Sequence, residues 1–176
     1  MTLNERTERT HREHTAIVEA YAGDAADELP LGGYAALMAL FVGAFGTVAS
    51  MARARHRLGN DLTARDLLLA GVAVHKLSRT ITRERVTVPL RAPFTRYTGT
   101  DGAGQVRERP RGRGLRRALG SLLTCQYCAG PWMAMAVTAG LLFAPRVTRM
   151  ANSMLTVATL SDFLHQAYAG ARRWSS

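Results

Sequence analysis

Long uncharged stretches alternate with clusters of arginine along this chain of 176 residues. Gly32–Ala52 and Ala118–Pro145 contain no charged residue, and Asp162 is the one charge between residues 150 and 171. Uninterrupted apolar stretches of about 18 or more residues are typical of helices that cross a bilayer. The pattern therefore predicts an all-α, polytopic integral membrane protein and argues against a soluble globular domain.

Four hydrophobic segments follow from this pattern, and three or four of them are expected to span the membrane. The first covers residues 32–52, which as a helix would extend roughly 31 Å and match the roughly 30 Å hydrocarbon core. The fourth, residues 150–171, has a similar length. The second covers residues 66–82. It is apolar over residues 67–74, and the charged residues Lys76 and Arg79 follow. Because a charge at the bilayer centre costs about 2.5–3.5 kcal/mol, its crossing is left open.

The third segment, residues 118–144, is too long for a straight crossing, because one helix of this length would extend about 40 Å. Gly130 and Pro131 predict a kink within one continuous helix, since proline lacks the N–H that bonds to the preceding turn. Between the second and third segments, the two prolines of residues 88–94 predict an extended segment. Residues 99–114 are rich in Gly and Arg and predict a mobile loop.

Charge is distributed unevenly along the chain. Residues 1–31 form an acidic polar arm, whereas residues 53–117 carry sixteen Lys and Arg against five acids. Basic loops mark the cytoplasmic side of membrane proteins and bind anionic head groups rather than nucleic acid in that setting. We therefore expect a multi-pass cell-membrane protein with loop 83–117 and the C-terminus in the cytoplasm; the N-terminus is cytoplasmic with four spans and outside with three. The arginines expected to contact lipid or a partner are Arg91, Arg113, Arg116 and Arg117.

Cys125 and Cys128 form the one motif with redox or metal chemistry. At this spacing on a helix they share a face, close enough for a disulfide or for two bonds to one metal ion. Three interpretations stay open: cysteines that only pack, a thiol-redox pair, or a site for zinc or another metal. A metal site needs a further ligand, for which the candidates are His75, Asp162 and His165. Apart from such a metal, no cofactor is expected.

Ionisable residues in segments that should be apolar are costly in a membrane unless they are paired. They are His75, Arg79, Asp162 and His165. The simplest expectation is an ion pair between Asp162 and Arg79 that holds the fourth segment against the second. The alternative is a proton relay through Asp162 and the two histidines.

Several short motifs together resemble one small bacterial family. They are His75–Arg79, Val88–Phe94, Gly112–Gly120, Leu123–Cys128 and Ser161–Phe163. The combination is similar to domain-of-unknown-function family 1360, bacterial membrane proteins with sporulation-associated Bacillus relatives, over about residues 66–171. The family commonly has proline where this chain has Gln126 and an acid where it has Ser121. The resemblance implies a helical membrane domain and no particular reaction.

No pattern in the sequence specifies a reaction, so the expected function depends on surfaces that could bind another protein. One such surface lies in the first hydrophobic segment, where small residues recur at every fourth position and let a second helix approach closely. They are Ala35, Ala39, Gly43 and Thr47. We therefore expect a non-enzymatic scaffold or partner-binding subunit, acting with a protein partner or as a homo-oligomer. The alternatives are a membrane thiol-redox or metal protein that uses Cys125 and Cys128, and a proton or ion pathway built by an oligomer.

Overall fold

The computed structural model describes residues 5–6, 8–9, 12–13, 29–56, 62–102 and 104–174. Within those residues it contains six α-helices, one short 3-10 helix and one antiparallel pair of strands. The helices are α2 Leu31–Ala54, α3 Ala64–Arg83, η2 Arg85–Thr87, α4 Val88–Arg91, α5 Gly114–Thr124, α6 Gln126–Phe143 and α7 Pro145–Trp174. The strands are β1 Thr95–Thr100 and β2 Val106–Pro110. The acidic arm expected over residues 1–31 lies almost entirely outside the described residues and stays a prediction.

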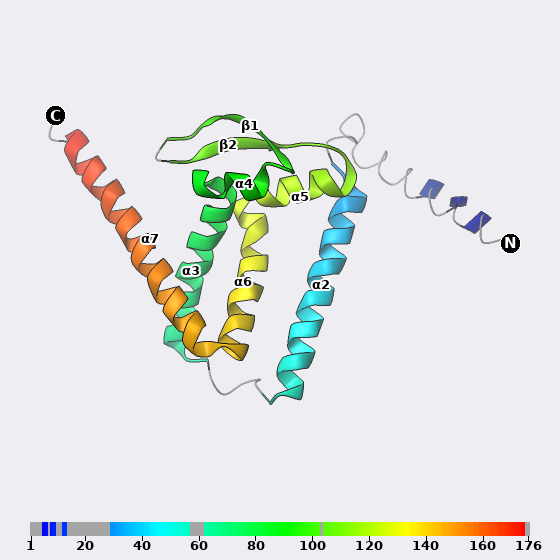
Figure 1. Ribbon diagram of the computed structural model, residues 1–176, viewed down its shortest axis with the longest axis horizontal. Coiled ribbons are helices and arrows are strands. Elements are labelled where there is room, and N and C mark those ends of the chain that lie inside the picture. Colours follow the sequence, from blue (N-terminus) through cyan, green and yellow to red (C-terminus); the bar gives the residue numbers. More distant parts are fainter. Residues whose placement is uncertain are drawn as a thin grey trace.

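Four long helices, α2, α3, α6 and α7, alternate in direction along the chain (Figure 1). α3 is central, because it packs against both α6 and α7, whereas α2 contacts α5 and α6. The hairpin cap, which comprises η2, α4, β1, β2 and α5, covers one end of these helices (Figure 1). We call this the hairpin end; α2 begins there and α3 ends there. At the opposite turn end, α2 finishes and α6 meets α7.

A charged contact fixes α3 to α7 at the turn end. Thr63 caps the start of α3, where its hydroxyl accepts a hydrogen bond from the N–H of Asp66 in a reciprocal capping box. The Asp66 carboxylate also receives two 2.9 Å hydrogen bonds from the guanidinium of Arg149 in α7. Such a two-point contact sets both the distance and the orientation of the two helices.

The apolar core between the long helices is small and centres on Ala70 of α3 and Leu141 of α6. Large apolar side chains remain exposed on the outer faces of α2, α3 and α7. Examples are Leu40, Leu68 and Leu164, which are 60%, 73% and 71% exposed. Contiguous exposed apolar faces of this kind mark a contact with another protein or with a membrane.

By length and composition, α2 is the one helix of the described residues that qualifies as a membrane span. It lies near the N-terminus, where a signal sequence has the same length and apolarity. The protein is thus mostly helical with one possible span, and the further spans expected from the sequence stay a prediction.

The single kinked helix expected over residues 118–144 is wrong, because the chain forms two helices there. α5 ends at Thr124 and α6 begins at Gln126, with Cys125 in an extended conformation between them. Pro131 lies inside α6 and not at the break. α5 lies across the hairpin end (Figure 1), where it packs against α2 and β2. The segment available for a crossing is therefore α6 alone, 18 residues or about 27 Å.

The basic loop expected over residues 83–117 is a folded cap. Residues 88–94 are not extended, because Pro89 lies in the first turn of α4, where its missing N–H leaves no helical hydrogen bond unmade. Residues 99–114 are not a mobile loop but contain most of a hairpin, in which β1 and β2 pair antiparallel. Gly102 and Gly104 adopt φ angles of 68° and 78° in its turn, a conformation that glycine adopts without strain. The all-α description is therefore wrong for this part of the chain.

A buried ion pair holds the hairpin cap together. Arg91 is fully buried and donates from Nε to Oε2 of Glu108, whose side chain is 3% exposed. Its other nitrogens donate to the carbonyl oxygens of Ile81 and Glu84 and to the hydroxyl of Thr87. Arg91 thereby joins the end of α3 to β2. The expected contact of Arg91 with lipid or a partner is wrong, because its side chain does not reach the surface.

Replacing Glu108 by alanine leaves the Arg91 guanidinium buried without its carboxylate. Removing one partner of a buried ion pair costs about 3–5 kcal/mol, so we expect Glu108→Ala to lower the free energy of unfolding in detergent by that amount. The matched control is Asp101→Asn, which breaks the exposed pair between Asp101 and Arg107 and is expected to have a much smaller effect. Equal stability of the two variants in thermal or denaturant unfolding would contradict this role of the buried pair.

Candidate functional site

Two groups of reactive side chains lie toward the hairpin end of the structure. One is the cysteine pair at the junction of α5 and α6. The other is a charged cavity bounded by α3, the turn of the hairpin and α7. They are separate sites, because the residues that line the charged cavity include neither cysteine.

Cys125 and Cys128 form a disulfide at the start of α6, with their Cα atoms 5.2 Å apart. Cys125 is the N-cap residue, and its Sγ accepts a 3.2 Å hydrogen bond from the backbone N–H of Cys128. Cys128 is exposed and Cys125 is half-buried. The sequence predicted one helix with both cysteines in its interior, whereas the structure places them at the N-terminus of α6. The partial positive charge of that terminus stabilises a thiolate.

Close packing of α5 sets the position of the break before this motif. A Cβ atom on Gly120 would clash with the carbonyl oxygen of Phe94 and would lie 3.1 Å from Cα of Pro110. The Tyr34 hydroxyl of α2 donates a 3.2 Å hydrogen bond to the hydroxyl of Ser121. These contacts hold α5 across the helix ends, so the chain must turn before α6 can begin.

A cavity of about 250 Å³ lies beside the disulfide, between α3 and α6. Gln126 and Tyr127, the two residues between the cysteines, line it on one side, and His75 lines it on the other. His75 therefore lies near the cysteine motif, while Asp162 and His165 line the charged cavity. One proton relay would require His75, His165 and Asp162 to lie together. The structure instead places His75 at a different cavity from the other two residues.

The charged cavity has a volume of about 490 Å³ and contains a three-membered ion cluster. Nζ of Lys76 lies 2.6 Å from Oε1 of Glu84 and 2.9 Å from Oδ2 of Asp162. The Lys76 side chain is 14% exposed and that of Asp162 is 40% exposed. Arg79 and His165 line the same cavity. Of the four ionisable residues expected in apolar segments, the structure thus brings together Arg79, Asp162 and His165.

The expected ion pair has the right anion and the wrong cation. Asp162 does join α7 to α3, but its partner is Lys76 and not Arg79. Residues three apart share a helix face, so the sequence pattern did not decide between these two cations. Glu84 was missed as a member of the cluster; it is the acid that directly follows α3, which is the signal that could have found it.

A metal site at the cysteine pair would require a further ligand. Among the residues that the structure describes, no group of three or more His, Cys, Asp or Glu side chains is arranged to hold a metal ion. Asp162 and His165 line the other cavity. Of the three candidate ligands, His75 alone lines the cavity beside the cysteines, and the metal site stays a prediction.

Three other arginines were expected at a lipid or partner surface. Arg113 and Arg116 are exposed, and Arg116 donates to the carbonyl oxygen of Pro93 in the hairpin cap. Arg117 is half-buried and lines a groove that also includes residues of both strands. Their contact with lipid stays a prediction.

These features define a small, mostly helical protein with one possible membrane span, a folded cap and a disulfide at a helix N-terminus. The chain belongs to the family described as Protein of unknown function (DUF1360), whose family model matches residues 68–168. This confirms the resemblance seen in the sequence. The matched residues include most of α3 and α7, the cap, the disulfide and both cavities, and they leave out α2. No curated protein and no solved structure matches the chain.

A pair of double-mutant cycles tests the ion cluster. We expect Lys76→Met and Asp162→Asn to be coupled by about 0.5–3 kcal/mol in the free energy of unfolding, because their side chains are in direct contact. The matched cycle of Arg79→Met with Asp162→Asn is expected to show a smaller coupling, because Asp162 pairs with Lys76 and Arg79 only lines the same cavity. A larger coupling in the Arg79 cycle than in the Lys76 cycle would restore the pairing expected from the sequence.

Proposed function

We propose that this protein is a multi-pass membrane protein that exchanges disulfides with a partner dithiol through Cys125 and Cys128. The observation that carries the proposal is the position of the motif. A bonded cysteine pair occupies the first turn of a helix, in which the residue Cys128 is exposed and the sulfur of Cys125 is bound by a backbone N–H. This arrangement favours thiolate formation at a site that another thiol can reach.

Four spans are supported by how the long helices run. α2 begins at the hairpin end, where an added Cβ on Gly33 would lie 2.8 Å from Cβ of Ala118 in α5. α3 returns from the turn end and packs against both α6 and α7. This central position favours four spans over the three-span alternative, in which the segment lies on the membrane surface. The start of α2 and the end of α7 then lie on the side of the hairpin cap (Figure 1).

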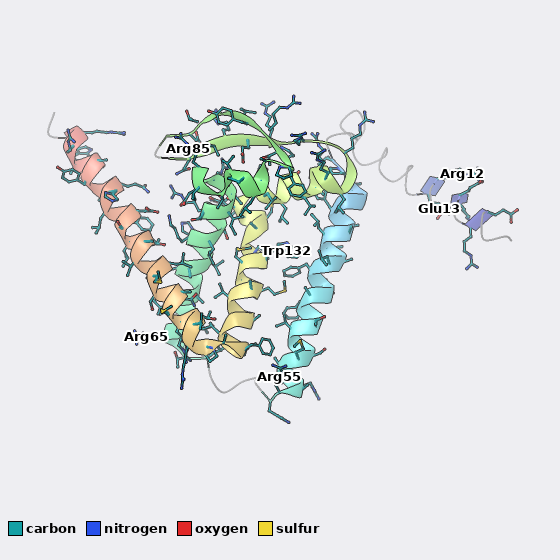
Figure 2. The ribbon with its side chains drawn as sticks, viewed as in Figure 1. Arg12, Glu13, Arg55, Arg65, Arg85 and Trp132 are labelled. Carbon is teal, nitrogen blue, oxygen red and sulfur yellow. A yellow bond between two sulfur atoms is a disulfide. The ribbon has the colours of Figure 1, made fainter. Side chains whose placement is uncertain are left out.

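The turn end also carries arginines, among them Arg55 and Arg65 (Figure 2). The cap is the more basic end, with Arg85 and the arginines of the hairpin and α5. Because basic regions remain in the cytoplasm, we infer that the cap and the C-terminus are cytoplasmic. In a reducing compartment the cysteine pair rests as a dithiol and forms the disulfide on reaction.

The exchange follows from the difference in exposure between Cys128, which is exposed, and Cys125, which is half-buried. A thiolate of the partner attacks Sγ of Cys128, the Cys125–Cys128 bond breaks, and Cys125 leaves as a thiolate. The N–H of Cys128 and the helix N-terminus stabilise that leaving group. The second thiol of the partner then attacks its own sulfur in the mixed disulfide and releases Cys128. Two electrons and two protons have passed from the partner to the pair; the reverse sequence reduces a partner disulfide.

The cavity beside the motif gives the partner room to approach. The side chains of Gln126 and Tyr127 form one of its walls, so a segment bonded to Cys128 would lie against them. Gln126 is the first residue of α6, where a backbone N–H has no hydrogen-bond partner within the helix.

A topology experiment tests the four spans. In a Cys125→Ser/Cys128→Ser background, we introduce Leu29→Cys, His56→Cys or Thr98→Cys and label intact cells and inverted vesicles with a membrane-impermeant maleimide. Leu29→Cys and Thr98→Cys are expected to label from the same side and His56→Cys from the opposite side. Labelling of His56→Cys and Thr98→Cys from one side and of Leu29→Cys from the other would favour three spans, in which α2 crosses and α3 lies on the membrane surface. Labelling of all three from one side would show that α2 does not cross.

A trapping experiment tests the exchange. Detergent-purified Cys125→Ser is expected to form a mixed disulfide with oxidised glutathione at Cys128, whereas the matched variant Cys128→Ser should react more slowly, because Cys125 is half-buried. Mass spectrometry follows both reactions. The wild type should cycle between disulfide and dithiol without losing its fold. Equal rates, a pair that cannot be reduced, or stoichiometric bound zinc would each contradict the proposal.

A non-enzymatic scaffold is the competing function. In its favour, the small residues of α2 are exposed, and a Cβ on Gly43 or Gly46 would meet no other atom within 4 Å. This face is open to a helix of a second chain. If the Cys125→Ser/Cys128→Ser variant retained every property of the wild type, the scaffold would be the better proposal.

A further inference from the structure

Four arginines line a groove on the hairpin cap. Its volume is about 770 Å³, and its lining comes from β1, from β2, from the segment that joins β2 to α5, and from α5 itself. The arginines are Arg96, Arg109, Arg111 and Arg117. Among the residues that the structure describes, no acidic side chain lines the groove.

The strand register places two of these charges directly against each other. Arg96 of β1 is the Cα partner of Arg109 of β2. Directly opposite residues of an antiparallel pair point to the same face, with Cβ atoms about 4.5–5.5 Å apart, and like charges there destabilise the sheet. Arg96, Arg109 and Arg111 are exposed, and none has an ion pair or side-chain hydrogen bond with any described residue.

The acids of the hairpin are bound to other arginines. Glu108 is adjacent to Arg109 in β2, so its side chain points to the opposite face, where it pairs with Arg91. Asp101 lies 2.7 Å from Arg107 at the end of the hairpin. That guanidinium holds the pKa of the Asp101 carboxyl below its usual range. Neither acid is available to neutralise the groove.

We propose that this groove binds phosphate groups. Arginine guanidinium groups donate two parallel hydrogen bonds to phosphate oxygens, and a bound phosphate between Arg96 and Arg109 would replace their repulsion with two attractions. Four arginines around one groove supply the charge for a ligand with two phosphates or for neighbouring head groups. The same chemistry is offered by the head group of an anionic phospholipid and by a soluble phosphate compound.

This site differs from the lipid surface expected from the sequence. Arg117 is common to both, whereas Arg91 is buried beneath the hairpin and Arg116 is bound to a backbone carbonyl of the cap. The groove instead depends on strand pairing, which brings together arginines that are thirteen positions apart.

The experiment uses the full chain in nanodiscs and two probes. Inorganic pyrophosphate is titrated by calorimetry into protein in phosphatidylcholine discs, and retention of phosphatidylglycerol is measured by native mass spectrometry. The test variant is Arg96→Gln/Arg109→Gln. The matched control is Arg53→Gln/Arg65→Gln, which removes the same charge from two exposed arginines near the turn end.

We expect the test variant to weaken binding of at least one probe tenfold or more, while the control stays within twofold of the wild type. Loss of pyrophosphate binding identifies a soluble phosphate ligand, and loss of phosphatidylglycerol retention identifies a lipid head group. Absence of saturable binding of both probes to the wild type overturns the proposal. So does any smaller difference between the test variant and the control, since net charge would then explain the binding. Because both substituted arginines of the test variant are exposed, circular dichroism should show an unchanged fold.

Discussion

The buried guanidinium of Arg91 is the constraint on which the arrangement of the hairpin end depends. The last carbonyl groups of a helix have no partner within the helix, and Arg91 donates to the carbonyls of Ile81 and Glu84 where α3 ends. Its charge is compensated by Glu108 of β2. Because this contact ties the hairpin to α3, it also fixes where α5 begins and how it crosses the helix ends. The turn at Cys125, and so the placement of the cysteine pair, follows from that crossing.

The long helices could be predicted from the sequence, whereas the fold of the hairpin cap could not. Apolar stretches of suitable length indicated helices near α2, α3 and α7, and the structure extends each of them by a few residues. The cap is stabilised by a contact between residues seventeen apart, Arg91 and Glu108, and by strand pairing. No local periodicity reports such contacts, so a Gly- and Arg-rich segment resembled a loop.

The sequence identified residues of the candidate sites but did not predict how these residues are arranged in space. Both cysteines were identified, but a helix that continued through residue 125 would have placed them on a helix face and not at a helix N-terminus. The break depends on Gly120 fitting closely against the Phe94 carbonyl, a contact between distant segments. Asp162 was recognised as a paired acid, and the choice of Lys76 over Arg79 depends on the rotation of α3 against α7. Sequence spacing leaves that rotation undetermined.

Cys125 is also the single residue that connects α5 to α6. The disulfide closes a small covalent ring over residues 125–128 at this corner, which limits the backbone torsions available there. When the disulfide is reduced, side-chain packing alone sets the angle between α5 and α6. Reduction or oxidation of the cysteine pair would thereby change how rigidly the junction of α5 and α6 holds the hairpin cap.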